Sequence, residues 1–571
     1  MRRILVGILA TIGAIALLLT AGLVAAGWLL LERAPQLPEQ MILTLDLRDD
    51  IPEMPGGDPL SSLGLSQAPT LIELTMALEQ AGRDPRVRGL VARLDEGGPG
   101  LAQAQELRTA LAGFRDQGKF AYAHADSFGE FGPGTVGYYL ATVFEEIHLQ
   151  PIGGLGLTGI LIETPLLREM LDKLGVEPSG GKRGAYKNAA DIFTDSTLSP
   201  AHRESLESLA DSFDQQIKAG IAEGRGVAVD KVARWIDNGP YLAAEAQAAG
   251  LVDQLGYWPE VIEQARTRAA TESELISLED YASAVGGTTD DDAPVIALVR
   301  GVGQIQRGDS DHRPTGGWVM GADTIAEALA DAADDPDVAA ILFRIDSGGG
   351  SAVASETIGR EVRRAVEQGK PVIVSMGAAA ASGGYWIAMD ASQIVADPAT
   401  LTGSIGVFAG KPVLTEFWDE VGVNWGQVSR GANATMWSTL DGFEGRGRAR
   451  LDAFLDRIYA AFTDGVARGR DLPRERVLDI AQGRVWTGQQ AAELGLVDEL
   501  GGSARALTLA KEAAGIAPDQ PVVLRSFPAP RDLWQQALAL LDGPPGLLEG
   551  LGSWLQLLRP GVLSAPPIVI R

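Results

Sequence analysis

Ser382 is the first candidate for chemistry in this sequence. A predicted strand and the small residues Ala380 and Ala381 precede it, and an amphipathic helix begins at Gly383. This places the hydroxyl near a helix N-terminus, where free backbone N–H groups stabilise a developing anion. The same pattern also fits a serine that only caps a helix. It is not a Gly-x-Ser-x-Gly elbow, because Ala380 occupies the first glycine position.

A glycine cluster in the run Asp346–Ser351 is the second candidate. Three consecutive glycines follow a predicted buried strand, and they permit unusual dihedral angles and a close approach of backbone N–H groups. An ordinary strand-to-helix turn is the alternative interpretation. A phosphate loop is weakly supported, because no Gly-Lys-Ser/Thr follows.

The sequence offers little histidine or cysteine to activate a serine. It has no Cys, which excludes disulfides, thiolate metal sites and a Cys nucleophile. None of the four histidines has an evident Asp partner at a matching turn: His124, His148, His202 and His312. A lysine can act as the base if burial lowers its pKa towards neutrality. No metal and no cofactor are expected.

An internal repeat at a spacing close to 250 residues organises the chain. The run Asp84–Asp95 resembles Asp335–Asp346, and Gly250–Asp253 recurs as Gly495–Asp498. A period this long is too large for a solenoid unit and indicates two duplicated domains.

The repeat identifies Lys187 as the base. The segment Arg183–Lys187 aligns with Arg430–Ala434, so the first half has Lys187 where the second half has Ala434. A solvated surface lysine is the alternative for Lys187 alone, and the comparison of the nucleophile turns argues against it.

The nucleophile turns align as Gly137–Ala141 with Gly384–Ala388, so Thr135 stands where the second half has Ser382. Each half therefore retains one partner and has lost the other. The sequence predicts one Ser–Lys pair per chain, and it leaves open whether both members come from the same chain or from neighbouring chains.

Alternating strands and helices must position these residues. Within the second half, strands are predicted at 295–299, 339–345 and 371–375, and helices at 324–333, 355–367 and 449–470. This order predicts an α/β fold with mainly parallel sheets and helices outside. The predicted domains are 40–285 and 295–517, joined by a polar linker at 286–294.

The N-terminus predicts a membrane anchor within residues 1–34. The run from Ile4 to Leu31 has no charged side chain and is long enough to cross a bilayer, and Arg2 and Arg3 keep the N-terminus cytoplasmic. The alternative is a signal peptide cleaved near Gly27. In a Gram-negative cell, both interpretations place the domains in the periplasm, and the anchored form is a single-pass protein of the inner membrane.

Composition and the C-terminal extension add two further expectations. The formal net charge of −27 argues against a nucleic-acid partner. Residues 518–571 contain apolar segments with Trp534 and Trp554 between proline-rich turns. They form either a tail packed on the protein or a subunit interface, or else a membrane-surface contact.

These features resemble the protease IV family, the long form of the bacterial signal peptide peptidase A family, which has the ClpP/crotonase fold. The resemblance covers nearly all of residues 40–515. It rests on the turn Ala381–Trp386, the run Leu401–Val407 and the run Ala185–Lys187. It implies tandem ClpP/crotonase-like domains that form a homotetramer with its bowl facing the membrane.

The resemblance also implies roles for individual residues. Ser382 is the nucleophile and Lys187 the general base. The N–H groups of Gly349 and Gly383 form the oxyanion hole, and Ser404 is a hydrogen-bond partner of the lysine.

The chain departs from the family pattern at two places. Asp346–Gly350 reads Asp-Ser-Gly-Gly-Gly where the family usually has Asn-Ser-Pro-Gly-Gly, and Asn188 stands where a serine usually follows the lysine. Neither change removes a catalytic group.

We therefore expect a membrane-anchored serine endopeptidase that degrades signal-peptide remnants and other apolar, unfolded segments. One alternative is a crotonase-like acyl-CoA enzyme, although CoA is cytoplasmic and the domains lie across the membrane. The other is a catalytically inert membrane scaffold with a relic dyad.

Overall fold

A computed structural model describes residues 37–56, 68–270, 272–286, 293–313, 317–529 and 569–570. The predicted anchor in residues 1–34 lies outside this part of the chain, as do most of the linker predicted at 286–294 and most of the extension at 518–571. No helix within the described ranges is both long enough and apolar enough to cross a membrane.

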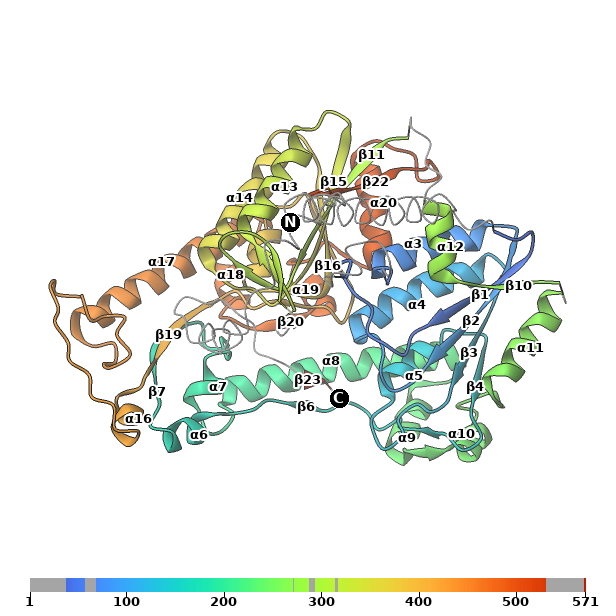
Figure 1. Ribbon diagram of the computed structural model, residues 1–571, viewed down its shortest axis with the longest axis horizontal. Coiled ribbons are helices and arrows are strands. Elements are labelled where there is room, and N and C mark those ends of the chain that lie inside the picture. Colours follow the sequence, from blue (N-terminus) through green and yellow to red (C-terminus); the bar gives the residue numbers. More distant parts are fainter. Residues whose placement is uncertain are drawn as a thin grey trace, which may run out of the picture.

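The first half is built on a six-stranded parallel sheet in the order β10-β1-β2-β3-β4-β9. Helices pack against it, and the long α8 runs under the second half (Figure 1). Its elements are β1 Met41–Asp46, α3 Leu71–Arg83, β2 Val87–Leu94, α4 Leu101–Asp116, β3 Phe120–Ala125, α5 Thr135–Ala141, β4 Glu146–Leu149, β5 Gly154–Leu155, β6 Ile162–Glu163, α6 Arg168–Lys173, β7 Glu177–Arg183, α7 Asp191–Thr194, α8 Pro200–Arg225, α9 Val229–Asn238, β8 Tyr241–Leu242, α10 Ala243–Ala249, β9 Gln254–Leu255, α11 Trp258–Ala269, β10 Glu274–Ser277 and α12 Leu278–Gly286.

The second half has an eight-stranded sheet whose main path is β20-β18-β16-β15-β11-β22, parallel except for the pairing of β18 with β20. Its elements are β11 Val295–Val302, β12 Gln304–Gln306, β13 Asp311–Arg313, β14 Gly317–Gly321, α13 Ala322–Asp334, β15 Val338–Ser347, α14 Ala352–Glu367, β16 Val372–Ala381, α15 Gly383–Ala388, β17 Gln393–Ala396, β18 Leu401–Gly403, β19 Val407–Val413, α16 Thr415–Glu420, α17 Gly445–Gly469, α18 Arg474–Ile480, β20 Val485–Thr487, α19 Gly488–Glu493, β21 Glu499–Leu500, α20 Ser503–Ala513, β22 Val523–Phe527 and β23 Val569–Ile570.

The predicted α/β architecture with mainly parallel sheets is confirmed. The predicted elements recur with longer bounds: the strand expected at 339–345 is β15, and the helix expected at 324–333 is α13. The largest difference is β16, which continues to Ala381 instead of ending at Ser375. The small-residue turn predicted before Ser382 is therefore the end of a strand.

Equivalent side chains stabilise both halves in the same way. The Tyr138 hydroxyl donates to the carbonyl of Leu251 at 2.7 Å, and the Tyr385 hydroxyl donates to that of Leu496 at 2.8 Å. The Lys119 ammonium donates to two carbonyls at the start of β2, and Lys370 does the same at β15. These pairs support the alignment inferred from the sequence repeat.

A buried ionic cluster joins the two halves. The guanidinium of Arg344, fully buried in β15, donates to Glu53 at 2.8 Å and to Glu106 at 2.9 Å, and both carboxylates belong to the first half. Apolar packing continues across the same boundary, where Ala399 and Val485 of the second half join the core of the first. Removing one partner of such a pair would leave a buried charge uncompensated.

One pair of strands crosses between the halves. β7 of the first half runs antiparallel to β19 of the second, from Arg183 opposite Val407 to Glu177 opposite Val413. The first half thereby sends an arm along the second half, which places the residues after β7 beside the second half's sheet (Figure 1).

Candidate active site

Ser382 lies between β16 and the six-residue helix α15 in a strained conformation. Its φ of 55° and ψ of −113° are unusual for a residue with a side chain. Its N–H donates to the carbonyl of Gly403 at 2.8 Å, and the residue is fully buried. Its hydroxyl contacts a side chain that follows the first half's arm.

Lys187 meets this hydroxyl from the first half. Its Nζ lies 2.7 Å from Ser382 Oγ, 3.0 Å from Ser404 Oγ and 3.0 Å from the Ser404 carbonyl oxygen. The lysine is fully buried, and this burial lowers its pKa to about 7. A large fraction is therefore neutral near pH 7, and a neutral amine can accept the serine proton.

Close backbone contacts hold Lys187 in place. The N–H of Tyr186 donates to the carbonyl of Gln482 at 2.8 Å. A Cβ on Gly483, which has φ of +79°, would lie 2.6 Å from the Lys187 nitrogen. A Cβ on Gly184 would lie 2.3 Å from the carbonyl of Gln482. Glycine at both positions lets the two backbones touch.

The predicted oxyanion loop lies against the start of α15. A Cβ on Gly383 would stand 3.2 Å from Gly349 Cα and 3.0 Å from the nitrogen of Gly350. The N–H of Gly349 donates to Ser347 Oγ at 3.1 Å. The nitrogen of Gly350 therefore lies beside Gly383. The sequence analysis named the glycine run that contains Gly350 but gave this residue no role of its own.

The unusual Asp346 connects this loop to the nucleophile strand. Its Oδ1 accepts the N–H of Ala379 at 2.9 Å, three residues before Ser382. The other departure, Asn188, is buried and makes a backbone bond to Tyr186.

The counterpart residues of the first half form no such arrangement. The Thr135 hydroxyl donates to the carbonyl of Gly159 at 2.8 Å. Gly134, and not Thr135, caps α5. The N–H of Gly134 donates to the carbonyl of Gly156, as the N–H of Ser382 donates to the carbonyl of Gly403. Ala434 is exposed in the segment between α16 and α17.

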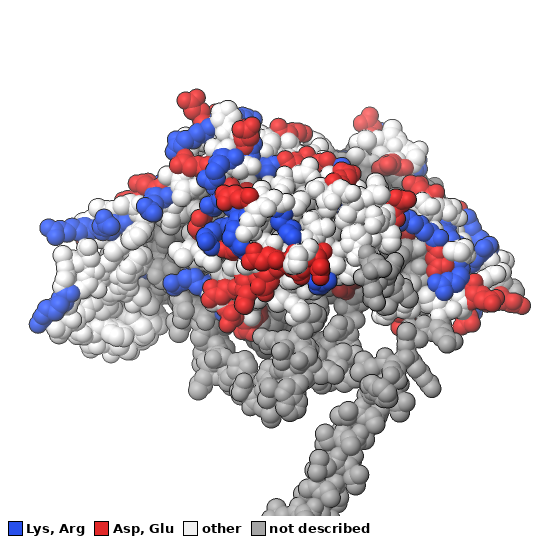
Figure 2. All heavy atoms as spheres, turned by 90° about the horizontal axis from the view of Figure 1, so that it is seen from above, with Lys and Arg blue, Asp and Glu red and all other residues white. Residues whose placement is uncertain are grey.

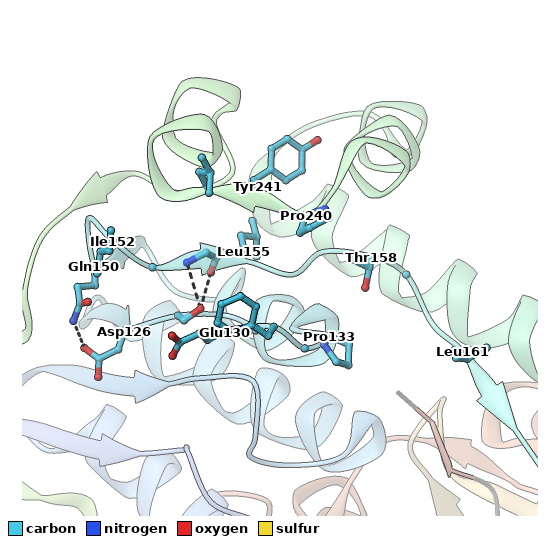
Figure 3. A pocket seen from close by; sticks show the side chains of 18 of the residues that line it. Asp126, Glu130, Pro133, Gln150, Ile152, Leu155, Thr158, Leu161, Pro240 and Tyr241 are labelled. Carbon is cyan, nitrogen blue, oxygen red and sulfur yellow. Dashed lines mark hydrogen bonds between the residues drawn. The ribbon is translucent and has the colours of Figure 1, made fainter.

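The histidines and a large cavity lie elsewhere. Within the described ranges, no histidine is hydrogen-bonded to the Ser–Lys pair, and no three His, Cys, Asp or Glu side chains gather to hold a metal ion. A cavity of about 940 Å³ opens on the first half, between the loops after β3 and β4 and the strand β8 (Figure 3).

Comparison with known proteins identifies the family. Residues 114–272 and 364–517 match peptidase family S49, one match in each half. The chain is 32% identical to Protease 4 of Haemophilus influenzae, over 88% of this chain and 83% of that protein. It is 33% identical to Protease 4 of Salmonella typhi, over 80% and 75%, and 30% identical to the chloroplastic serine protease SPPA of Arabidopsis thaliana, over 90% and 73%. The chain therefore belongs to peptidase family S49 and is a serine peptidase.

Proposed function

We propose that the protein is an endopeptidase that uses a Ser–Lys dyad, with Ser382 as nucleophile and Lys187 as general base. The observation that supports this most directly is the 2.7 Å contact between Ser382 Oγ and a fully buried Lys187 Nζ. Both groups belong to one chain, so no neighbouring copy is needed to complete the pair.

The reaction follows from the contacts of the two side chains. Neutral Lys187 accepts the proton of Ser382 as Oγ attacks the scissile carbonyl carbon. The oxyanion is stabilised by the N–H groups of Gly383 and Gly350, whereas the N–H of Gly349, the donor implied by the family resemblance, donates to Ser347 Oγ. The Lys187 ammonium then protonates the leaving amine. In the second step, neutral Lys187 accepts a proton from water as the water oxygen attacks the acyl carbon, and the Lys187 ammonium returns that proton to Ser382 Oγ as the acyl–oxygen bond breaks.

Ser404 keeps the lysine directed at the nucleophile. Its hydroxyl and carbonyl oxygens both lie 3.0 Å from Lys187 Nζ. The two N–H groups of the neutral amine donate to these two oxygens, which leaves its lone pair for the proton of Ser382.

The proposed substrates are signal-peptide remnants and other apolar, unfolded segments. An extended segment can pair its backbone with a strand near the site, while the small residues around Ser382 admit its main chain. Membership in a peptidase family gives the acyl-CoA alternative no support. The inert-scaffold alternative requires a buried lysine and a strained serine to be retained without use.

The proposal also includes an inner-membrane anchor at residues 4–31, periplasmic domains and assembly into a homotetramer. A carbonate wash tests the anchor: the full chain should stay with the membrane, and deletion of residues 1–33 should release it. A mature N-terminus near residue 27 would instead show a cleaved signal.

Hydrolysis of an unfolded apolar peptide tests the function. The full chain should cleave it, whereas Lys187→Met and Ser382→Ala should not. A control variant, Thr135→Ala, should retain activity. Cleavage by Lys187→Met at the wild-type rate would contradict the dyad, and hydrolysis of acyl-CoA without peptide cleavage would favour the alternative enzyme.

A further inference from the structure

A short segment before β20, residues 482–484, contacts the chain on both sides of the buried lysine. The carbonyl of Gln482 accepts the N–H of Tyr186 at 2.8 Å, and the carbonyl of Arg484 accepts the N–H of Ser404 at 2.7 Å. Tyr186 immediately precedes the lysine, and two oxygens of Ser404 lie 3.0 Å from the lysine Nζ. The main chain of this segment therefore holds both the neighbour of the base and its hydrogen-bond partner.

The Arg484 side chain extends this link to the aromatic ring of Tyr186. Its guanidinium carbon lies 5.0 Å from the centre of the Tyr186 ring and 4.4 Å from the centre of the Trp486 ring. Both distances are typical of cation–π contacts. Trp486 is itself held by a hydrogen bond from its indole N–H to the carbonyl of Ile480 at 3.1 Å. The guanidinium thus packs against one ring from each half of the chain.

Glu204 of α8 connects the same two side chains from the other side. One of its carboxylate oxygens accepts the Tyr186 hydroxyl at 2.8 Å, and the other accepts an N–H of Arg484 at 2.8 Å. Because one carboxylate binds both partners, Tyr186 cannot turn away from Arg484 without losing a hydrogen bond. We call the four side chains of Tyr186, Glu204, Arg484 and Trp486 the Arg484 clamp.

The Arg484 clamp differs from the ion pairs of the molecular surface. Charged side chains of both signs are spread over the face shown in Figure 2, and exposed ion pairs usually contribute little to stability. The side chain of Arg484 is 16% exposed, and the residue contacts the chain on both sides of a fully buried lysine. A contact at this position can therefore determine where the lysine amine lies.

We propose that Arg484 is a positioning residue for Lys187, an inference that rests on the proposed Ser–Lys dyad. Through its contacts with Tyr186 and Ser404, Arg484 keeps the amine directed at Ser382 and sealed from water. Burial alone lowers the pKa of Lys187 to about 7, and no charged side chain within the described ranges contributes to this change. Loosening the clamp admits water to the amine, which raises its pKa towards the ordinary value of 10.5.

The titratable groups around the clamp keep one protonation state above pH 7. The hydrogen bond from Tyr186 lowers the pKa of Glu204, and the same hydrogen bond raises the pKa of Tyr186. Burial lowers the pKa of His202, two residues before Glu204, below its usual 6.5. An activity profile between pH 7 and pH 9 therefore follows the titration of Lys187.

Arg484→Met tests the clamp, because it removes the guanidinium and keeps an unbranched apolar stem. In the full chain, the apparent pKa of kcat/KM for peptide cleavage should rise by about one to two pH units. The smaller neutral fraction of Lys187 should then lower kcat/KM about 5- to 50-fold at pH 7. At pH 9 the loss should be about twofold at most, because the amine is then largely neutral in both proteins.

Arg268 provides a matched control in the first half. Its guanidinium carbon lies 5.1 Å from the centre of the Phe120 ring and 5.6 Å from that of Tyr122. It also donates to Glu145 and to the Tyr122 hydroxyl, each at 3.0 Å. Arg268 belongs to α11, at the right edge of Figure 1 and away from β20. Arg268→Met removes the same kinds of contact but should keep the wild-type activity and pH profile.

Two substitutions of Glu204 separate hydrogen-bond geometry from charge. The Glu204 side chain is 57% exposed, so its replacement leaves the core intact. Glu204→Ala removes both hydrogen bonds and should shift the pH profile in the same direction as Arg484→Met. In Glu204→Gln, the amide oxygen accepts from Arg484 and the amide N–H donates to the Tyr186 hydroxyl, so the wild-type profile should return. Equal shifts in the two Glu204 variants would show an effect of charge and overturn the positioning role.

Failure of the clamp and failure of the dyad give different results. If Lys187→Met is inactive and Arg484→Met keeps the wild-type pH profile, the clamp is refuted and the dyad stands. If Lys187→Met cleaves the peptide at the wild-type rate, the dyad falls and this inference falls with it. A loss in Arg484→Met that is equally large at pH 7 and pH 9 would indicate a general structural defect and would also refute the positioning role.

Discussion

Replacing Lys187 by Met shows how much folding stability the protein loses by burying a lysine and how much peptidase activity depends on that lysine. Burial lowers the lysine pKa from 10.5 to about 7. Between these values the unfolded chain binds a proton that the folded chain does not, so the stability of the folded state rises with pH in this window. At pH 7 and below, keeping the lysine buried costs about 4–5 kcal/mol.

Met fills a similar volume without that cost, but it leaves the oxygens of Ser382 and Ser404 without their nitrogen partner. This loss offsets about 1–3 kcal/mol of the gain. Lys187→Met should therefore be inactive yet more stable than wild type by about 2 kcal/mol at pH 6. The advantage should shrink by about 1.4 kcal/mol for each pH unit above 7.

Denaturant unfolding of both proteins from pH 6 to pH 9 measures this difference, in which the contributions of other titrating groups cancel. Wild-type kcat/KM should rise about tenfold from pH 6 to pH 8, as the neutral fraction of Lys187 grows. A stability difference that does not change with pH, or a flat activity profile, would refute a base with a pKa near 7.

Three further outcomes are expected. A serine-directed phosphonate should label each chain once, at Ser382; Thr135→Ala should be labelled like wild type, and a second adduct in the first half would contradict the single site. Gly483→Ala should lower kcat/KM about 100-fold, because its Cβ displaces the Lys187 backbone. Gly369→Ala, at a similar positive φ but with open space around it, should keep full activity; equal losses in both variants would implicate backbone strain alone. Peptidase activity should fall in proportion to the fraction of chains labelled by the phosphonate, and it should reach zero at one adduct per chain.

The sequence predicted the pairing of Ser382 with Lys187 through the reciprocal losses at Thr135 and Ala434. The repeat carries this information because flanking residues such as Tyr138 and Tyr385 keep equivalent contacts in the two halves. The sequence did not predict that both side chains come from one chain, because this depends on the tertiary pairing of β7 with β19. Nothing in the local pattern of β7, which contains Pro178 and two glycines, marks it as a strand.

The sequence also did not identify the residues that hold the catalytic pair and the two halves in place. Gly483 is one of 70 glycines, and only its contact with Lys187 gives it importance. The buried partners of Arg344 lie 291 and 238 residues away along the chain, so no local pattern could connect them. The extent of β16 was underestimated because the alanines before Ser382 have low strand propensity.

The division of the proposed dyad between two halves has a consequence for synthesis. Lys187 emerges from the ribosome about 300 residues before Gly483, whose backbone contacts it, an interval on the order of 15–60 s at ordinary elongation rates. Throughout that time the nascent chain carries a base without a nucleophile or a nucleophile without a positioned base. With the proposed dyad, a newly made molecule should therefore pass through translation unable to cut itself or its neighbours, and it should gain proteolytic capacity only once both halves have folded.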